Sequence, residues 1–163
     1  MRAAAFAVLA LLAVAFVWSC TLEGPPSDDA MIRNLEINRG AFDALLAMIR
    51  EDRGLERVDD EWTRPDDPRT IGVSFKRIAA YSLLFQKAGI PRGFYSFEPY
   101  PRVLFVAYAS GSYIRGSAKS YYYADEAPTE GMVEGPLDRY HDARKVHVSR
   151  AIGGNWYLQY RRD

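Results

Sequence analysis

The sequence predicts an α+β domain in which two N-terminal helices pack on one face of an antiparallel meander sheet of about five strands. Residues 38–88 carry apolar side chains at helical spacing, whereas β-rich runs separated by Gly, Pro and Ser turns begin near residue 93. Short spacers between such runs favour antiparallel neighbours. The helices are expected on one side of the sheet, because each element buries a single apolar face.

The two helices are expected over residues 38–53 and 69–88. In the first, four apolar residues recur at i, i+3, i+4 and i+7 and form one stripe: Phe42, Leu45, Leu46 and Ile49. Asn38 suits the N-cap, and Gly54 suits the left-handed position after the helix. The second helix is expected to end at Gly89, because Pro91 prevents its continuation.

The β-rich runs cover residues 94–97, 103–109, 113–115, 119–123, 146–150 and 156–160. A turn is expected at Gly116-Ser117, and a short helix within 132–140. The last run alternates cleanly, so Trp156, Leu158 and Tyr160 are expected to face the helices.

The first twenty residues read as an export signal rather than a folded element. Arg2 precedes an unbroken apolar run over 3–18, and the small Ser19 comes before Cys20. We therefore divide the chain into a signal peptide (1–19), Cys20 with a flexible tether (20–34) and a single α+β domain (35–163). Gly24, Pro25 and Pro26 favour extended chain in the tether.

Val17-Trp18-Ser19-Cys20 resembles the box of bacterial lipoproteins, in which signal peptidase II cuts before a lipidated cysteine. This resemblance implies palmitate at Cys20, membrane attachment and a place in the cell envelope, which is the periplasmic side of the outer membrane in a Gram-negative cell because Thr21 is not aspartate. Two alternatives stay open. The run could be an uncut anchor, although 16 apolar residues fall just short of a bilayer span, or a signal cut elsewhere.

The amino-acid composition argues against several classes of activity. The 21 basic residues equal the 21 acidic ones, so nothing predicts nucleic-acid binding. With Cys20 lipidated, the mature domain has no thiol, which excludes thiol catalysis. We predict no cofactor and no metal: the acids of 59–69 lack EF-hand order, and the histidines form no H-E-x-x-H motif.

A strand over 119–123 places Lys119, Tyr121 and Tyr123 on one face, and Arg115 could join them. Together with Tyr157, these residues make a candidate surface for a protein partner, since aromatic rings and arginine anchor interfaces. The alternative is that they form one side of an amphipathic sheet, where tyrosine is favoured for its shape.

Three functions follow from these observations. The first is a membrane-anchored, non-catalytic module that binds another protein, as an envelope accessory or an immunity-like protector. The second is a weak envelope hydrolase that uses His141 or His147 as a base, although no G-x-S-x-G or S-x-x-K motif supports it. The third is glycan or peptidoglycan binding through Tyr121, Tyr123 and Tyr157.

Two C-terminal segments carry a second resemblance. The pattern G-S-x-K-x-Y-x-Y over 116–123 and G-N-W-Y-L-x-Y over 154–160 is similar to small exported bacterial lipoproteins of uncharacterised activity. This resemblance covers the last third of the domain and implies only the class of protein and its cellular compartment. The helix-helix-sheet order is also similar to small lipoproteins of outer-membrane assembly machines, as a fold analogy without shared motifs.

Overall fold

The structure is a computed structural model that describes residues 24–59, 62–97, 101–112, 115–129 and 131–163, with the backbone alone for Ser112 and Arg115. These residues form three α-helices, α2 (Asp28–Ile37), α3 (Arg39–Glu51) and α4 (Phe75–Ala88), and two short 3-10 helices, η2 (Pro68–Ile71) and η3 (Leu137–Tyr140). Among the described helices, none combines the length and the apolar character that crossing a bilayer requires. The predicted signal peptide and Cys20 lie outside the described residues.

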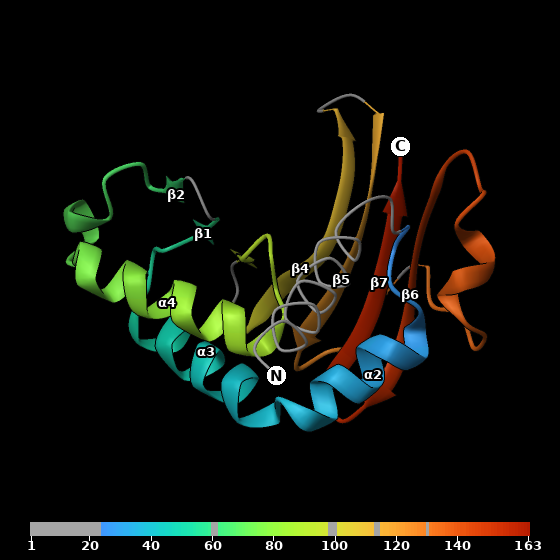
Figure 1. Ribbon diagram of the computed structural model, residues 1–163, viewed down its shortest axis with the longest axis horizontal. Helices are drawn as coiled ribbons and strands as arrows, with labels where there is room; N and C mark the ends of the chain where they lie inside the picture. The colour runs from blue at the N-terminus through green and yellow to red at the C-terminus, as the bar shows by residue number, and fades with distance from the viewer. Residues whose placement is uncertain (1–23, 60–61, 98–100, 113–114, 130) are drawn as a thin grey trace, which may run out of the picture.

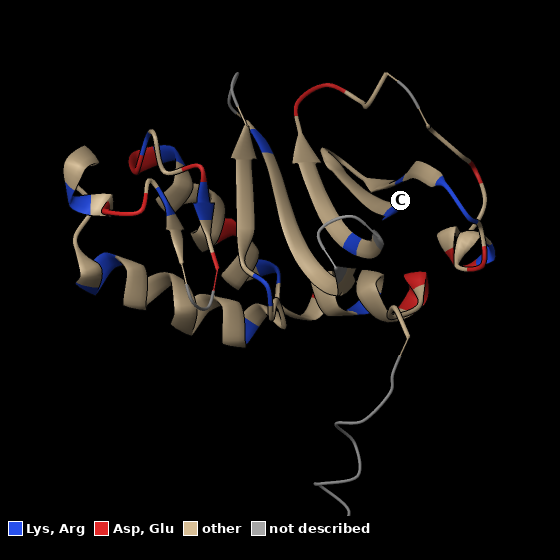
Figure 2. Ribbon diagram, turned by 90° about the horizontal axis from the view of Figure 1, so that it is seen from above, with Lys and Arg blue, Asp and Glu red and all other residues tan. Residues whose placement is uncertain are grey.

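Seven strands form one antiparallel sheet in the order β2-β1-β3-β4-β5-β7-β6. Their bounds are β1 Arg57–Val58, β2 Thr63–Arg64, β3 Phe94–Phe97, β4 Arg102–Ser112, β5 Arg115–Ala124, β6 Val146–Gly153 and β7 Trp156–Arg162. Figure 1 shows the helices crossing the strands, and Figure 2 shows them gathered along one side of the sheet. The predicted α+β class with helices on an antiparallel sheet is confirmed. Three helices and seven strands replace the predicted two and about five.

Helix α3 forms where the apolar stripe predicted it. Its four stripe residues are all buried: Phe42, Leu45, Leu46 and Ile49. Phe42 lies at the centre of an aromatic cluster, with ring centroids 5.6 Å from Phe105, 4.9 Å from Tyr121 and 5.4 Å from Trp156. The cluster joins α3 to three strands of the sheet, so the stripe is the main contact between the two layers.

Helix α2 covers residues 28–34 of the tether predicted over 20–34, so this part of the prediction is wrong. The Ser27 side chain accepts the N–H of Ala30 at 3.2 Å, which caps the helix before Asp28. Met31 and Leu35, one turn apart, are 2 % and 5 % exposed and belong to the core. A segment that buries apolar side chains is part of the fold, so the folded unit begins several residues earlier than expected.

The predicted helix over 69–88 is interrupted. Gly72 adopts a left-handed conformation with φ of 80° and ends η2. Ser74 then caps α4, because its side chain accepts the N–H of Arg77 at 3.2 Å. The predicted end at Gly89 is confirmed, with φ of 64° at that glycine.

The strand order also departs from a simple meander. β7 lies between β5 and β6, so the closing strand is central rather than at the edge. The predicted turn at Gly116-Ser117 is wrong, since both residues lie in β5 and pair with Gly111 and Ser110 of β4. The predicted helix within 132–140 is reduced to η3.

Candidate functional site

Lys119 lies inside the protein rather than on a surface. It pairs across the strands with Tyr160, on the face that the helices cover, and its side chain is 0 % exposed. Its ammonium nitrogen is 2.7 Å from Asp28 Oδ1 and 2.6 Å from Asp138 Oδ1, and it donates to the Pro26 carbonyl at 2.7 Å. A buried ammonium needs such partners, because leaving it unpaired in the interior costs several kcal/mol.

Asp28 completes this arrangement from the first turn of α2. Its Oδ2 accepts the Leu137 N–H at 2.9 Å and an Arg150 N–H at 2.9 Å. Burial opposes ionisation of Asp28, but the hydrogen bonds from Lys119, Leu137 and Arg150 prevail and hold the pKa of its carboxyl below the ordinary value. Asp28, Lys119, Asp138 and Arg150, called here the Asp28 cluster, contain two acids and two bases.

The Asp28 cluster joins four elements that lie far apart in the sequence: α2, β5, η3 and β6. Its charges balance, and both Lys119 and Asp28 are closed to solvent, at 0 % and 1 % side-chain exposure. The ammonium group is therefore closed to a ligand by Asp28, Asp138 and the Pro26 carbonyl. The arrangement positions the N-terminal helix on the sheet, and Lys119 acts as a structural residue.

The tyrosines predicted to form a binding surface are divided between the two faces of the sheet. Tyr121 is 1 % exposed, accepts from Asn34 Nδ2 at 3.0 Å and donates to the Met31 carbonyl at 3.1 Å. Burial raises the pKa of Tyr121 to about 12. Tyr123 packs edge-on against Trp156 at 5.0 Å, on the same helix-covered face. Tyr157 lies on the opposite face, where its ring centroid is 6.1 Å from that of Tyr122.

The prediction of an exposed face is therefore wrong for Lys119 and Tyr121, whereas Tyr123 is partly exposed. These residues pair with Tyr160, Leu158 and Trp156, which point toward the helices as the alternation in β7 predicted. Directly opposite residues in a sheet point to the same side, so all three side chains point toward the helices. Because Tyr121 and Tyr157 lie on opposite faces of the sheet, they also cannot both bind one glycan. The side chain of Arg115 lies outside the described residues.

The two histidines do not converge on one site. The His141 ring packs on Tyr160 at 5.0 Å on the helix side of the sheet, with Nε2 3.7 Å from Asp138 Oδ1. Burial and the nearby Lys119 charge lower the pKa of His141 below its ordinary value. His147 pairs with Arg161 of β7, on the opposite face, and is exposed. Within the described residues no three His, Cys, Asp or Glu side chains gather as metal ligands.

A different feature stands out on the helix-free face, at the end of the sheet formed by β1, β2 and β3. The guanidinium of Arg57 lies 3.4 Å from the Tyr95 ring centroid and 4.8 Å from that of Trp62. Tyr95 in turn stacks with Phe97, at 6.3 Å and an interplanar angle of 14°. We call these four residues, Trp62, Arg57, Tyr95 and Phe97, the aromatic ladder.

Strand pairing explains how the aromatic ladder forms. Arg57 of β1 lies directly opposite Tyr95 of β3, so their side chains share a face. The neighbouring Phe94 points to the helices and packs against Tyr81 at 5.4 Å, which places Tyr95 on the other side. Trp62 and Phe97 are each 45 % exposed, whereas Arg57 is 6 % exposed and contacts the Asp59 carboxylate.

The sequence analysis missed the aromatic ladder. β1 and β2 have two residues each, and β2 falls in residues 59–69, where acids and prolines indicate a polar loop. Trp62, a large aromatic residue among acids and prolines, was the one signal that this loop packs against something. Comparison with known proteins adds no assignment: no family model, curated protein or solved structure matches the chain.

Proposed function

We propose that this chain is a lipid-anchored extracytoplasmic protein whose folded domain binds another protein through the aromatic ladder, as an envelope accessory or immunity-like module without catalysis. Cys20 at the end of an apolar run supports the anchor. The observation that carries the binding role is a buried arginine held between two rings, with Trp62 and Phe97 left exposed beside it.

The chemistry of the ladder favours an apolar protein surface as the partner. Trp, Tyr and Arg dominate the binding energy of protein interfaces, where they lie at the centre and are surrounded by weaker contacts. The Arg57 charge is already matched by Asp59, so the ladder does not select an anionic partner. Aromatic or aliphatic side chains packed on Trp62 and Phe97 would bury rings that water now contacts.

Photo-crosslinking tests the ladder directly. A photoreactive phenylalanine analogue at Phe97 or Trp62 is expected to capture a defined protein in intact cells. The same analogue at Leu83 of α4, an apolar residue that is 61 % exposed, is the matched control and is expected to capture little. The double substitution Trp62→Ala and Phe97→Ala should reduce recovery of the partner at least about tenfold, a change of about 1.4 kcal/mol.

Two outcomes would contradict this role. One is recovery of the monomer alone from both ladder positions. The other is equal capture of the same protein by the analogue at Leu83, which would show that the crosslinks at the ladder are not specific. Retention on purified peptidoglycan that is lost in the double variant would identify a glycan partner instead.

The anchor has its own test at Cys20. The substitution Cys20→Ala is expected to abolish incorporation of labelled palmitate, because the thiol that carries the diacylglycerol is removed. Because signal peptidase II cuts before a lipidated cysteine, the variant should also keep residues 1–19 and migrate as the larger precursor. Palmitate labelling of the unchanged protein in the same cells is the control. A parent protein that still carries residues 1–19 would favour an uncut apolar anchor and contradict the lipid anchor.

A further inference from the structure

A basic pocket lies at the corner of the sheet where the β4–β5 hairpin extends past the end of β7. Gly116 of β5 still pairs with Gly111 of β4, whereas β7 pairs with β5 only as far as Ser117. The space beyond β7 measures about 1200 Å³. The start of β6, with the two residues that precede it, closes the other side. Figure 1 shows the C-terminal end of β7 between the β4–β5 hairpin and the start of β6.

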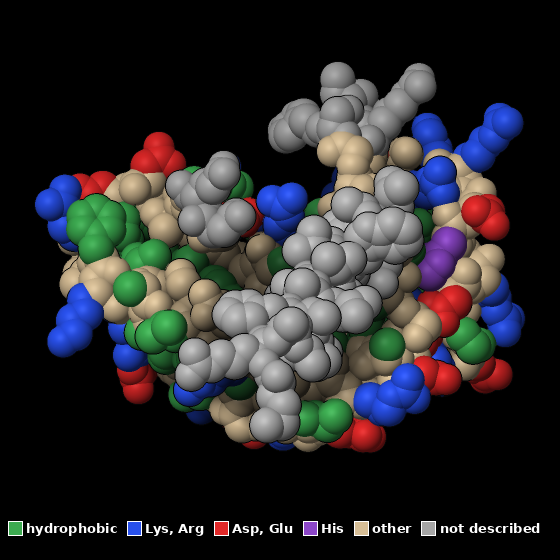
Figure 3. Space-filling view, in the orientation of Figure 1, with side chains coloured by type: hydrophobic (Ala, Val, Ile, Leu, Met, Phe, Trp, Pro, Cys, Tyr) green, Lys and Arg blue, Asp and Glu red, His purple; other side chains and the backbone are tan. Residues whose placement is uncertain are grey.

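The pocket concentrates positive charge in a chain whose total formal charge is zero. Its lining contains four full cations and one histidine: Arg144, Lys145, Arg161, Arg162 and His147. The single acid in the lining, Asp163, pairs with Arg161 at 2.7 Å. Figure 3 shows Lys and Arg side chains gathered beside the C-terminal end of β7. Because the whole chain has 21 bases and 21 acids, this excess is local.

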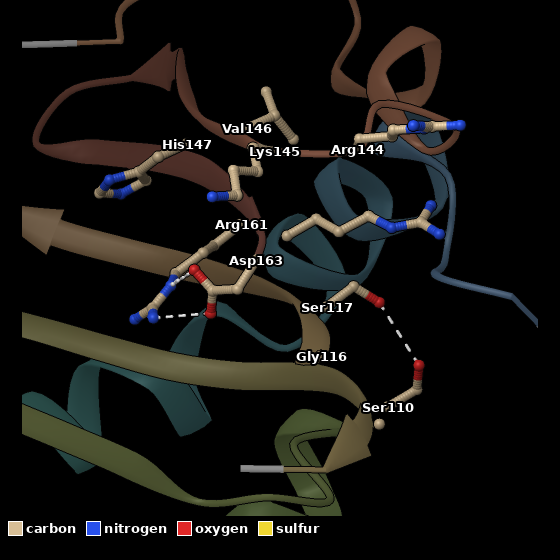
Figure 4. Close-up of a pocket in the computed structure, with 11 residues that line it drawn as sticks. Ser110, Gly116, Ser117, Arg144, Lys145, Val146, His147, Arg161 and Asp163 are labelled. Carbon is tan, nitrogen blue, oxygen red and sulfur yellow. Dashed lines mark hydrogen bonds and ion pairs between the residues drawn. The ribbon is translucent and has the colours of Figure 1, made fainter. Parts of the chain in front are cut away.

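The four cations differ in whether another group of the protein already binds them. Arg162 donates to the His141 carbonyl, and Arg161 is held by Asp163 through two hydrogen bonds of 3.1 and 2.7 Å. Within the described residues, Arg144 and Lys145 form no ion pair, and both are exposed. Figure 4 shows Lys145, His147 and Arg161 on one side of the pocket and Arg144 on the other. A ligand that contacts both Arg144 and Lys145 must therefore span the pocket.

Neutral donors surround the same space. Ser110 and Ser117 face each other across the hairpin with their hydroxyl oxygens 3.4 Å apart. Each hydroxyl can donate to an acceptor oxygen when the other does not hold it. Arginine forks and a lysine ammonium bind phosphate oxygens through short charge-assisted hydrogen bonds. The pocket is open and has room for a molecule larger than a phosphate ion.

We propose that this basic pocket binds a phosphorylated ligand, with Arg144 and Lys145 as the principal contacts to its phosphate oxygens. The phosphate can belong to a soluble compound or to the headgroup of an anionic phospholipid, which share the same chemistry. The site is separate from the aromatic ladder, which lies at the other end of the sheet order, so it stands independently of the proposed protein partner.

The test titrates the full chain, held in a neutral detergent, with defined probes. Pyrophosphate represents a soluble ligand. Dihexanoylphosphatidylglycerol represents an anionic lipid headgroup, and dihexanoylphosphatidylcholine is its zwitterionic counterpart. At least one anionic probe is expected to bind with a Kd below about 1 mM, which corresponds to about 4 kcal/mol of binding free energy. Binding should weaken with added salt, because the contacts are ionic.

A pair of matched variants locates the site. The double substitution Arg144→Gln and Lys145→Gln is expected to weaken binding at least about tenfold, or about 1.4 kcal/mol. The control, Lys76→Gln and Lys87→Gln, removes two exposed cations from α4 and should change affinity less than about twofold. All these side chains are exposed, so both variants should keep the urea midpoint of the parent.

Each result decides the proposal. Loss of pyrophosphate binding in the pocket variant assigns a soluble phosphate ligand, and loss confined to phosphatidylglycerol assigns a lipid headgroup. The proposal is overturned if neither anionic probe binds, if phosphatidylcholine binds as well as phosphatidylglycerol and pyrophosphate does not bind, or if the two variants weaken binding equally.

Discussion

Asp28→Ala is expected to lower the free energy of unfolding by about 3 kcal/mol, since removing one partner of a buried ion pair leaves the other charge uncompensated. Lys119 is 0 % exposed and would keep only Asp138 and the Pro26 carbonyl as partners. The Leu137 N–H and Arg150 would each lose an acceptor. Urea unfolding followed by circular dichroism measures the loss.

The neighbouring Asp29→Ala is the matched control. Asp29 shares the first turn of α2 but is exposed, so both variants lose the same favourable charge at the helix N-terminus. The control should cost less than about 1 kcal/mol. Adding Lys119→Met to Asp28→Ala should restore part of the loss, because the buried ammonium is then absent. Equal losses in Asp28→Ala and Asp29→Ala would contradict the role assigned to the Asp28 cluster.

The same cluster predicts a direction of pH dependence. The folded-state pKa of Asp28 lies below its ordinary value of 3.8, so the stability that its ionisation contributes is present above that pH. This contribution is lost as the pH falls through the folded-state pKa. The difference in unfolding free energy between the parent protein and Asp28→Ala should therefore be largest at neutral pH and should shrink below pH 3.8.

Phe42→Ala is expected to cost about 3–5 kcal/mol, the range for deleting a fully buried phenylalanine. Phe42 is 0 % exposed and makes edge-on contacts with rings from β4, β5 and β7. Removing it leaves a cavity between the helix layer and the sheet, where these contacts cannot be replaced. Urea unfolding should show a lower midpoint with an unchanged slope, since the surface exposed on unfolding changes little.

Phe75→Ala provides the same chemical change at the surface. Phe75 begins α4 and is 59 % exposed, with the Arg69 guanidinium 5.1 Å from its ring centroid. Its loss should cost less than about 1 kcal/mol, the scale of an exposed cation–π contact. A similar effect for both substitutions would place the core somewhere other than at Phe42.

Several local elements of the fold could be predicted from the sequence alone, as individual residues show. The stripe of α3 follows from spacing alone, because a helix turns its residues by a fixed angle whatever it packs against. Trp156, Leu158 and Tyr160 are buried as their alternation predicted. α2 could have been recognised as well, since Ser27 precedes two acids and Met31 and Leu35 lie one turn apart. The adjacent glycine and prolines favoured extended chain instead.

The candidate sites needed spatial information. Arg57 and Tyr95 are adjacent only because β1 and β3 pair, and β1 is too short to show a pattern of its own. Lys119 was expected at the surface, because a lysine is costly to bury alone. Its partners Asp28 and Asp138 come from distant segments, and they make burial acceptable.

The sequence alone determined the fold class, the helix stripe and the alternation of the closing strand, because these are local consequences of backbone periodicity. The prediction of export and lipidation also comes from the sequence, because it depends on residues 1–20. The tertiary structure decided which face each strand residue occupies relative to the helices and which charges meet. Both the facing of the strand residues and the pairing of charges depend on strand order and on contacts between distant segments. As a result, Lys119 and Tyr121 are buried, whereas Trp62 and Phe97 are exposed.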